Sequence, residues 1–350
     1  MPGIFKMDGM MTPSKNKPWL DKVIEDTLEP ELPICDPHHH LWEFRHDRVA
    51  PKYLLDEILS DLNSGHNIVS TVFIECSAMY RARGPEHMKC VGETEFVNGI
   101  AAMSASGLYG KCRVAAAIVG SANLNIGSAV GEVLDAHVQA GGGRFRGIRC
   151  QGQWDADSSI RSAKDASGPD RFSNAKFREG FAELAPRNMT FEAWCYHTQL
   201  KEVTALARAF PDTTIILNHF GGPLGIGPYE GKADDIFPIW QKEIANLATC
   251  QNVLAKLGGI NMDINGFGWE HHNTPPTSET LMQATRRWYE HTIEHFGTSR
   301  CMFESNFPVD MTSCSYNTLW NSFKHLTLDY SVDEKRQLFH DTAVRTYKIN

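Results

Sequence analysis

The feature that most restricts the fold of this chain is a regular alternation, from residue 33 onward, of short apolar runs with longer amphipathic segments. The predicted strands cover residues 33–36, 68–76, 113–120, 144–151, 190–195, 213–220, 252–260 and 300–307. The predicted helices cover residues 86–106, 128–140, 174–186, 199–210, 234–249, 278–296 and 332–347. Strands that alternate with helices pair in parallel, so these eight units predict an α/β fold, a (β/α)8 TIM barrel.

An open, doubly wound sheet is the competing architecture for the same order of elements. The glycines at residues 141–143 do not support its dinucleotide-binding version, because they precede a predicted strand instead of following one. Residues 1–30 are polar and carry no sustained period. We therefore expect an N-terminal arm over residues 1–30 and a single barrel domain over residues 31–350.

Composition and charge exclude several classes of partner. The formal net charge is −8 and there is no basic stripe for phosphate contacts, so we expect no nucleic-acid partner. No apolar run approaches the roughly 20 residues that cross a bilayer, and the N-terminus has no signal-peptide core. We therefore expect no membrane association and a cytoplasmic protein. The nine cysteines are scattered singly, which predicts packed thiols and no disulfide framework.

Side chains that can bind a ligand or move a proton stand at the C-terminal ends of most of the predicted strands. They are His38 and His40 after the first strand, Glu75 in the second, Arg149 and Gln151 in the fourth, His197 after the fifth, His219 in the sixth and Asn306 in the eighth. In a (β/α)8 barrel these ends meet at one rim, where the active site is built. The predicted catalytic residues are His38, His40, His197, His219 and Asn306.

The first of these strand ends carries a His-x-His pattern. On an extended chain His38 and His40 point to one side and His39 points to the other, so His39 is expected to be structural. Neutral imidazole is a ligand for zinc and related divalent metals. The predicted metal ligands are His38, His40 and His197. The simpler alternative is that these histidines only form hydrogen bonds at a solvated strand end.

Five motifs give the chain a resemblance to a known family. "DPHHHLW" follows the first predicted strand, "RGIRCQ" lies at the fourth, "YHTQL" follows the fifth, "LNHFGGP" lies at the sixth and "FESNFPVD" at the eighth. Together they resemble the amidohydrolase-2 family of the amidohydrolase superfamily, a group of TIM-barrel hydrolases that includes lactonases. The resemblance extends to the C-terminal "FHDTAVRTYKI". It implies a hydrolase that opens a lactone with an activated water. The resemblance implies a divalent metal cofactor, of which zinc is the favoured candidate, and the alternative is a reaction without a metal.

The chain departs from the family pattern at the eighth strand. The family has a general-base aspartate at the position of Asn306, and an amide cannot take up a proton near neutral pH. Glu304 could replace it from one layer deeper, where a buried carboxyl needs a partner or keeps its proton. Asp310 lies beyond Pro308 and is expected at the surface or as a cap. A histidine, with an ordinary pKa of about 6.5, is the replacement that we favour.

The predicted substrate-binding residues are Glu75, Tyr80, Arg149, Gln151 and Trp269. Arg149 can hold a carboxylate or stabilise an oxyanion, or it can form a buried ion pair with Glu75 or Glu192. Trp269 belongs to a long loop after the seventh strand, which is expected to form a pocket wall or to pack the barrel mouth or a subunit contact. These residues suit a small-molecule substrate. The sequence does not decide between a monomer and a homo-oligomer.

Two other functions compete with lactone hydrolysis. The first is a lyase, because related barrels of the superfamily decarboxylate aromatic or unsaturated acids with a bound metal. That chemistry relies on the same aspartate, so Asn306 argues against it. The second is a non-catalytic barrel that binds a small molecule, in which the loss of the aspartate marks a disabled enzyme.

Overall fold

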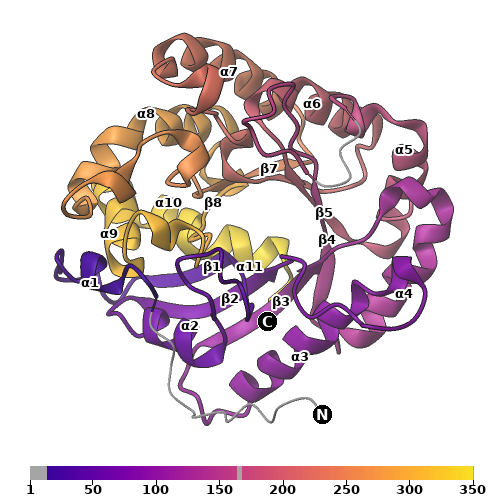
Figure 1. Cartoon of the computed structure of the whole chain (residues 1–350), viewed down its shortest axis with the longest axis horizontal. Coiled ribbons are helices and arrows are strands. Elements are labelled where there is room, and N and C mark those ends of the chain that lie inside the picture. Colours follow the sequence, from indigo (N-terminus) through magenta and orange to yellow (C-terminus); the bar gives the residue numbers. More distant parts are fainter. Residues whose placement is uncertain (1–13, 164–167, 350) are drawn as a thin grey trace.

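The computed structural model of the chain describes residues 14–163 and 168–349, and within them eight parallel strands form a ring surrounded by helices (Figure 1). The strands are β1 (Pro33–His39), β2 (Asn67–Ile74), β3 (Arg113–Gly120), β4 (Phe145–Gln151), β5 (Thr190–Trp194), β6 (Ile215–Leu217), β7 (Val253–Leu257) and β8 (Cys301–Phe303). Each strand pairs in parallel with the next one in the sequence. This sequential order confirms the (β/α)8 TIM barrel and excludes the doubly wound sheet, whose strand order reverses.

The ring closes between β1 and the segment that follows β8. His39 and Phe307 form an isolated parallel bridge, in which the backbone N–H of His40 donates to the carbonyl oxygen of Phe307 at 2.8 Å. The N–H of Asn306 donates to the carbonyl oxygen of His38 at 2.9 Å. β8 is shorter than the predicted strand, and a φ of +55° at Asn306 ends the extended path. Asn306 therefore lies in a turn attached to β1.

The sequence predicted the positions of most of the helices. The α-helices are α1 (Lys17–Leu20), α2 (Leu55–Leu62), α3 (Val91–Ala105), α4 (Val130–Ala140), α5 (Ala175–Phe181), α6 (Leu200–Ala209), α7 (Ala233–Ala248), α8 (Ser278–Phe296), α9 (Tyr316–Leu326), α10 (Val332–Arg336) and α11 (Thr342–Thr346). A π-helical turn, Gln337–Asp341, separates α10 from α11 within the last predicted helix. The prediction missed α1, α2 and α9. At α9 a readable signal was present, because the side chain of Ser315 caps the helix by accepting from the N–H of Thr318.

Buried apolar side chains form one large group outside the ring and another inside it. The outer group fills the space between the strands and the helices. The inner group, which we call the floor cluster, consists of Cys35, Val72, Ile74, Ala116, Ala117, Val119, Ile216, Met302, Ala343, Tyr347 and Ile349. Its strand residues come from β1, β2, β3, β6 and β8, and of these β3, β6 and β8 are not neighbours in the sheet. Their side chains can therefore meet only inside the barrel.

The C-terminal segment completes the floor cluster. In Figure 1, α11 (yellow) lies beside β1, and Tyr347, which follows α11, is fully buried. Arg146 in β4 holds this segment, because its Nε donates to the carbonyl oxygen of Tyr347 at 2.6 Å. The hydroxyl of Tyr347 donates to the carboxylate of Glu192 in β5. The end of the chain thus reaches from the floor of the barrel to its polar interior.

Residues 14–30 lie along the outside of the barrel. Nδ2 of Asn16 donates to the carbonyl oxygen of Met311 at 2.7 Å, and Nζ of Lys324 in α9 donates to that of Leu28 at 2.6 Å. The division of the chain at residue 30 stays a prediction, and residues 1–13 of the predicted arm lie outside the described residues.

The cysteines and the apolar character of the helices were both subjects of expectations from composition. All nine cysteines lie within residues 14–163 and 168–349, where none forms a disulfide and eight are buried, which confirms packed thiols. Over the same ranges, no helix combines the length and apolar character needed to cross a membrane.

Candidate active site

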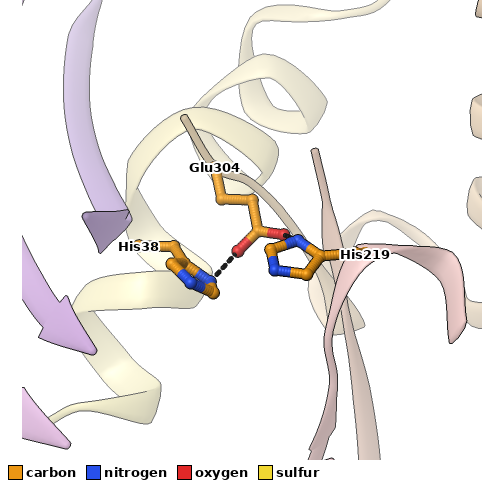
Figure 2. Close-up of side chains that lie close together, drawn as sticks. All are labelled: His38, His219 and Glu304. Atoms are coloured by element: carbon orange, nitrogen blue, oxygen red, sulfur yellow. Dashed lines mark ion pairs between the residues drawn. The ribbon is translucent and has the colours of Figure 1, made fainter. Parts of the chain in front are cut away.

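Two imidazoles and one carboxylate meet inside the barrel at the C-terminal ends of β1, β6 and β8. Oε2 of Glu304 lies 2.5 Å from Nδ1 of His38, and Oε1 lies 2.6 Å from Nδ1 of His219 (Figure 2). All three side chains are buried. Glu304 directly follows β8 and lies two residues after Met302, so the alternation of an extended chain points both into the barrel. Glu304 therefore joins two histidines from distant parts of the sequence.

Two glycines after β7 make room for this group. A Cβ atom on Gly258 would lie 2.1 Å from the backbone oxygen of Glu304, and one on Gly259 would lie 2.1 Å from Nδ1 of His219. Neither distance is possible for real atoms, and Gly259 also has a φ of +68°, which glycine adopts without strain. The "LGGI" segment therefore lets the backbone pass directly beneath the ring and the carboxylate.

Arg149 in β4 connects His38 to Glu75. Its Nε donates to Oε1 of Glu75 at 2.8 Å, and its Nη2 donates to the backbone oxygen of Glu75. Its Nη1 lies 3.2 Å from Nε2 of His38. Because a guanidinium only donates, this contact leaves the proton of His38 on Nδ1, the atom that faces Glu304. Gln151 also donates to Oε1 of Glu75, at 2.9 Å. The buried Arg149–Glu75 ion pair considered from the sequence is present, next to His38.

A second buried ion pair lies beside Glu304. Nζ of Lys256 in β7 is 2.8 Å from Oε2 of Glu192 and 4.0 Å from Oε2 of Glu304. Nδ2 of Asn218 donates to Oε2 of Glu192 at 2.5 Å, and the hydroxyl of Tyr347 donates to Oε1. Lys256 was not among the predicted site residues. Its signal was a single charged residue in the middle of an otherwise apolar strand, which needs a buried partner.

His40 and His39 have separate surroundings. The ring centroid of His40 lies 5.0 Å from that of His38, and its Nδ1 lies 2.8 Å from the carbonyl oxygen of Ile74. A carbonyl only accepts, so Nδ1 carries the proton and Nε2 keeps a lone pair. Burial lowers the pKa of His40 well below its ordinary value, and the ring is therefore neutral. His39 faces elsewhere, with Nε2 2.9 Å from the hydroxyl of Thr71.

His197 is buried but lies outside the three-residue group. Its Nδ1 accepts from the backbone N–H of Leu224 at 3.3 Å, and its ring packs edge-on against Tyr229 at 5.3 Å. Burial lowers the pKa of His197 to about 4. Among the described residues inside the barrel, one group of three possible metal ligands has its donor atoms within 4.8 Å of one another. That group is His38, His219 and Glu304. The ligand set His38, His40 and His197 stays a prediction.

Two of the predicted substrate-binding residues lie further from this group. Tyr80 is 38% exposed. Its pKa is raised above the ordinary value, mainly by burial of its hydroxyl and then by the negative charges of Glu93 and Glu75. Trp269 is buried against Phe267, with nearly parallel rings 5.8 Å apart. Tyr80 is thus within electrostatic range of the polar interior, whereas Trp269 belongs to the outer apolar group.

The expectation that Asp310 lies at the surface is wrong. Asp310 is fully buried, and its Oδ1 accepts from Nδ2 of Asn306 at 2.9 Å. Burial raises the pKa of its carboxyl well above the usual range. The expectation failed because the chain turns back into the protein after Pro308, and Asp310 begins a helical turn, Asp310–Thr312, whose first two residues are buried. The amide of Asn306 is thus engaged with a neighbouring carboxyl.

The group of His38, His219 and Glu304 fits a divalent metal ion. Two imidazoles and a carboxylate are ligand types that zinc takes, and one donor atom from each lies within 4.8 Å of the others. Nδ1 of each histidine and both oxygens of Glu304 are buried without a hydrogen bond of good geometry. An ion at Nδ1 of His38 would displace the proton that the Arg149 contact leaves there, so binding would release a proton.

The fold and this polar centre define a (β/α)8 barrel whose chemistry lies at the C-terminal ends of its strands. The chain belongs to the amidohydrolase family, because the sequence profile of that family matches residues 35–349. This match confirms the resemblance carried by the five motifs.

Three similar proteins illustrate the range of that family. The uncharacterised protein y4mH of Sinorhizobium fredii is 32% identical over 338 residues, which cover 91% of this chain and 99% of that protein. An L-fucono-1,5-lactonase of Burkholderia multivorans is 24% identical over 209 residues, 59% of this chain and 64% of the lactonase. A crystal structure of an amidohydrolase from Burkholderia multivorans with bound zinc has a TM-score of 0.70 at 21% identity, and the likeness covers 91% of this chain and 99% of that one. That likeness shows the shared fold.

Proposed function

We propose that this protein is a hydrolase that opens a small-molecule lactone by adding water across its ring ester bond. The observation that carries the proposal is the carboxylate of Glu304 between His38 and His219, at the end of the barrel where Asn306 stands in place of the family's aspartate. A carboxylate is thus retained in the site at a different position. Similarity to the L-fucono-1,5-lactonase supports a cyclic ester as the substrate.

The reaction requires one proton acceptor and one proton donor. Water adds to the carbonyl carbon, the ring C–O bond breaks, and the ring oxygen takes a proton to become a hydroxyl group. His40 suits both steps, because Nδ1 is held by the carbonyl oxygen of Ile74 and Nε2 is left as the nitrogen with the lone pair. Nε2 accepts the proton from water and returns it to the departing ring oxygen. The new carboxylic acid then ionises into solvent.

Arg149 suits the stabilisation of the charge that develops on the carbonyl oxygen. Its guanidinium has five N–H groups, and its contacts with Glu75 and His38 use three of them. The other two are able to donate to an oxyanion. The Glu75 ion pair fixes the plane of the guanidinium, so these donors are oriented before the substrate arrives.

Glu304 holds the rings of His38 and His219 in place. These three residues would also hold a divalent ion, which supplies Lewis-acid polarisation of the carbonyl and a lower pKa of coordinated water when it is bound. Metal analysis of protein purified without chelator, before and after zinc loading, measures whether the group takes an ion.

The experiment that tests the function measures ring opening of a panel of sugar and aromatic lactones, with and without added zinc. We expect Glu304→Gln to reduce turnover by about 10²- to 10⁴-fold, because the amide no longer carries the charge that pairs with both imidazoles. Glu243→Gln is the matched control, since Glu243 is a buried carboxylate of α7 whose Oε1 lies 3.7 Å from Lys201, outside the site. Full activity of the Glu304 variant would contradict the proposal.

Two outcomes would replace lactone hydrolysis with another function. Release of carbon dioxide from hydroxybenzoates, with no lactone opened, would identify a decarboxylase. Binding of a lactone or its product without any turnover would identify a binding barrel. The panel therefore separates the three functions by product.

A further inference from the structure

We propose that His291, Glu294 and His295 of α8 form a second binding site for a divalent transition-metal ion, on the outer surface of the barrel. One donor atom from each of these side chains lies within 4.8 Å of the other two. All three belong to one helix on the outside of the ring, so the site is separate from the candidate active site. The proposal does not depend on the proposed function.

The spacing of the three residues places them on one face of α8. Side chains three and four residues apart are neighbours on a helix, and two histidines four apart can bind one zinc ion from the same face. The ring centroids of His291 and His295 are 4.1 Å apart, with planes inclined by 40°. His291 is half-buried, whereas Glu294 and His295 are exposed. An ion can therefore reach the site directly from solvent.

Each imidazole is oriented by a backbone carbonyl oxygen. Nε2 of His291 lies 2.9 Å from the carbonyl oxygen of Gln241 in α7, and Nδ1 of His295 lies 2.9 Å from that of His291. Both of these nitrogens carry the proton, because a carbonyl only accepts. Nδ1 of His291 and Nε2 of His295 are then the nitrogens with lone pairs. Nδ1 of His291 accepts from Nε2 of Gln241 at 3.4 Å, a long contact that an ion would replace. Backbone contacts of this kind fix the tautomer of metal-binding histidines.

Two arginines near the site would repel a cation, but each of them is paired with a carboxylate. Arg286 and Arg287 lie one turn earlier on α8. Nε of Arg286 is 2.5 Å from Oε1 of Glu290, and Nη1 of Arg287 is 2.6 Å from Oδ1 of Asp234. Both guanidinium groups are thus paired with other carboxylates, and Glu294 adds a negative charge to the site.

The ligand set indicates which ions can bind. Two nitrogens and one carboxylate suit Zn²⁺, Ni²⁺ and Cu²⁺, whereas Mg²⁺ and Ca²⁺ prefer sites made of oxygens. Three protein ligands leave further positions for water. Copper is expected to bind most tightly of the three, in the usual order of divalent ions.

The first measurement is the retention of untagged, full-length protein on a chelating resin charged with Ni²⁺ or Cu²⁺. An ion fixed to a resin cannot enter the barrel interior, so retention reports histidines at the surface. We expect His295→Gln to elute at a clearly lower imidazole concentration than the unchanged protein. His87→Gln is the matched control, because it removes another exposed histidine, and it should elute with the unchanged protein. Circular dichroism confirms that each variant is folded.

A zinc titration in solution gives the size of the effect. His295→Gln removes one of two linked imidazoles, so zinc affinity at the α8 site should fall roughly 100-fold. Any zinc binding inside the barrel should keep its affinity. Equal retention of the His295 variant and the unchanged protein overturns the proposal. An equal loss of retention in the His87 variant also overturns it, because any exposed histidine would then suffice.

Discussion

The floor cluster and the charged side chains next to it show how the same strands form two different environments. The pairs on the inner face are Ile216 and Asn218 for β6, Leu254 and Lys256 for β7, and Met302 and Glu304 for β8. In each pair the apolar residue comes first and the polar one follows two residues later, on the same face of the strand. Within each of these strands, position along the strand therefore decides whether an inner side chain joins the floor or the polar side chains. Between strands the level differs, because Lys256 of the polar side chains pairs in register with Met302 of the floor.

The two environments are stabilised by different physical effects. The floor cluster is stabilised by the removal of apolar surface from water, about 25 cal/mol per Å². The other environment, which we call the polar layer, consists of Glu75, Arg149, Glu192, Lys256 and Glu304, all of them buried. Its charges need partners, because an unpaired buried ion costs several kcal/mol. The polar layer should therefore be sensitive to the loss of a charge, and the floor cluster to the loss of volume.

The largest effect is expected from Lys256→Met, which tests the pairing of charges in the polar layer. The substitution keeps the volume of the side chain but leaves Glu192 and Glu304 without their cation. We expect a loss of about 3–5 kcal/mol in the free energy of unfolding, measured by urea denaturation. The double variant Lys256→Met, Glu192→Gln should lose less than the sum of the two single variants. Strict additivity would show that the pair is not coupled.

A smaller effect is expected from Met302→Ala, which tests whether the floor cluster acts apart from the polar layer. Removing a fully buried side chain leaves a cavity and should cost about 2–3 kcal/mol of stability. Zinc affinity of the His38, His219 and Glu304 group should stay unchanged, since Met302 belongs to the floor cluster and supplies no donor atom to that group. A tenfold weaker zinc affinity in this variant would break the comparison between the two environments.

The smallest effect is expected from Tyr347→Phe, because Tyr347 packs in the floor cluster and donates to Glu192 of the polar layer. The ring stays in place and only the hydrogen bond to a charged group is lost, which should cost about 1.5 kcal/mol of stability. Tyr330→Phe, at a partly exposed tyrosine, is the matched control and should be near neutral. Equal changes in the urea midpoints of the two variants would show that the hydroxyl of Tyr347 does not stabilise the polar layer.

The sequence predicted the fold well and the composition of the site only in part. The alternation of elements and the five motifs led to the barrel and to the family, because both depend on local patterns. Glu304 was considered, but a histidine was favoured, since burial of a carboxylate was expected to need a partner. That partner is the pair His38 and His219, which only the closed ring brings together. Lys256 was missed for the same reason, since its partner Glu192 lies on another strand.

What the sequence determined by itself is the alternation of eight short apolar strands with most of the helices between them, and the polar groups where the strands end. The tertiary structure alone decided which of those polar groups meet. Ring closure placed the turn with Asn306 against β1 and left Glu304, directly after β8, as the inner residue closest to that turn. The physical reason is that contacts between strands depend on their tilt and register around the closed sheet, and no local pattern along one chain segment encodes these.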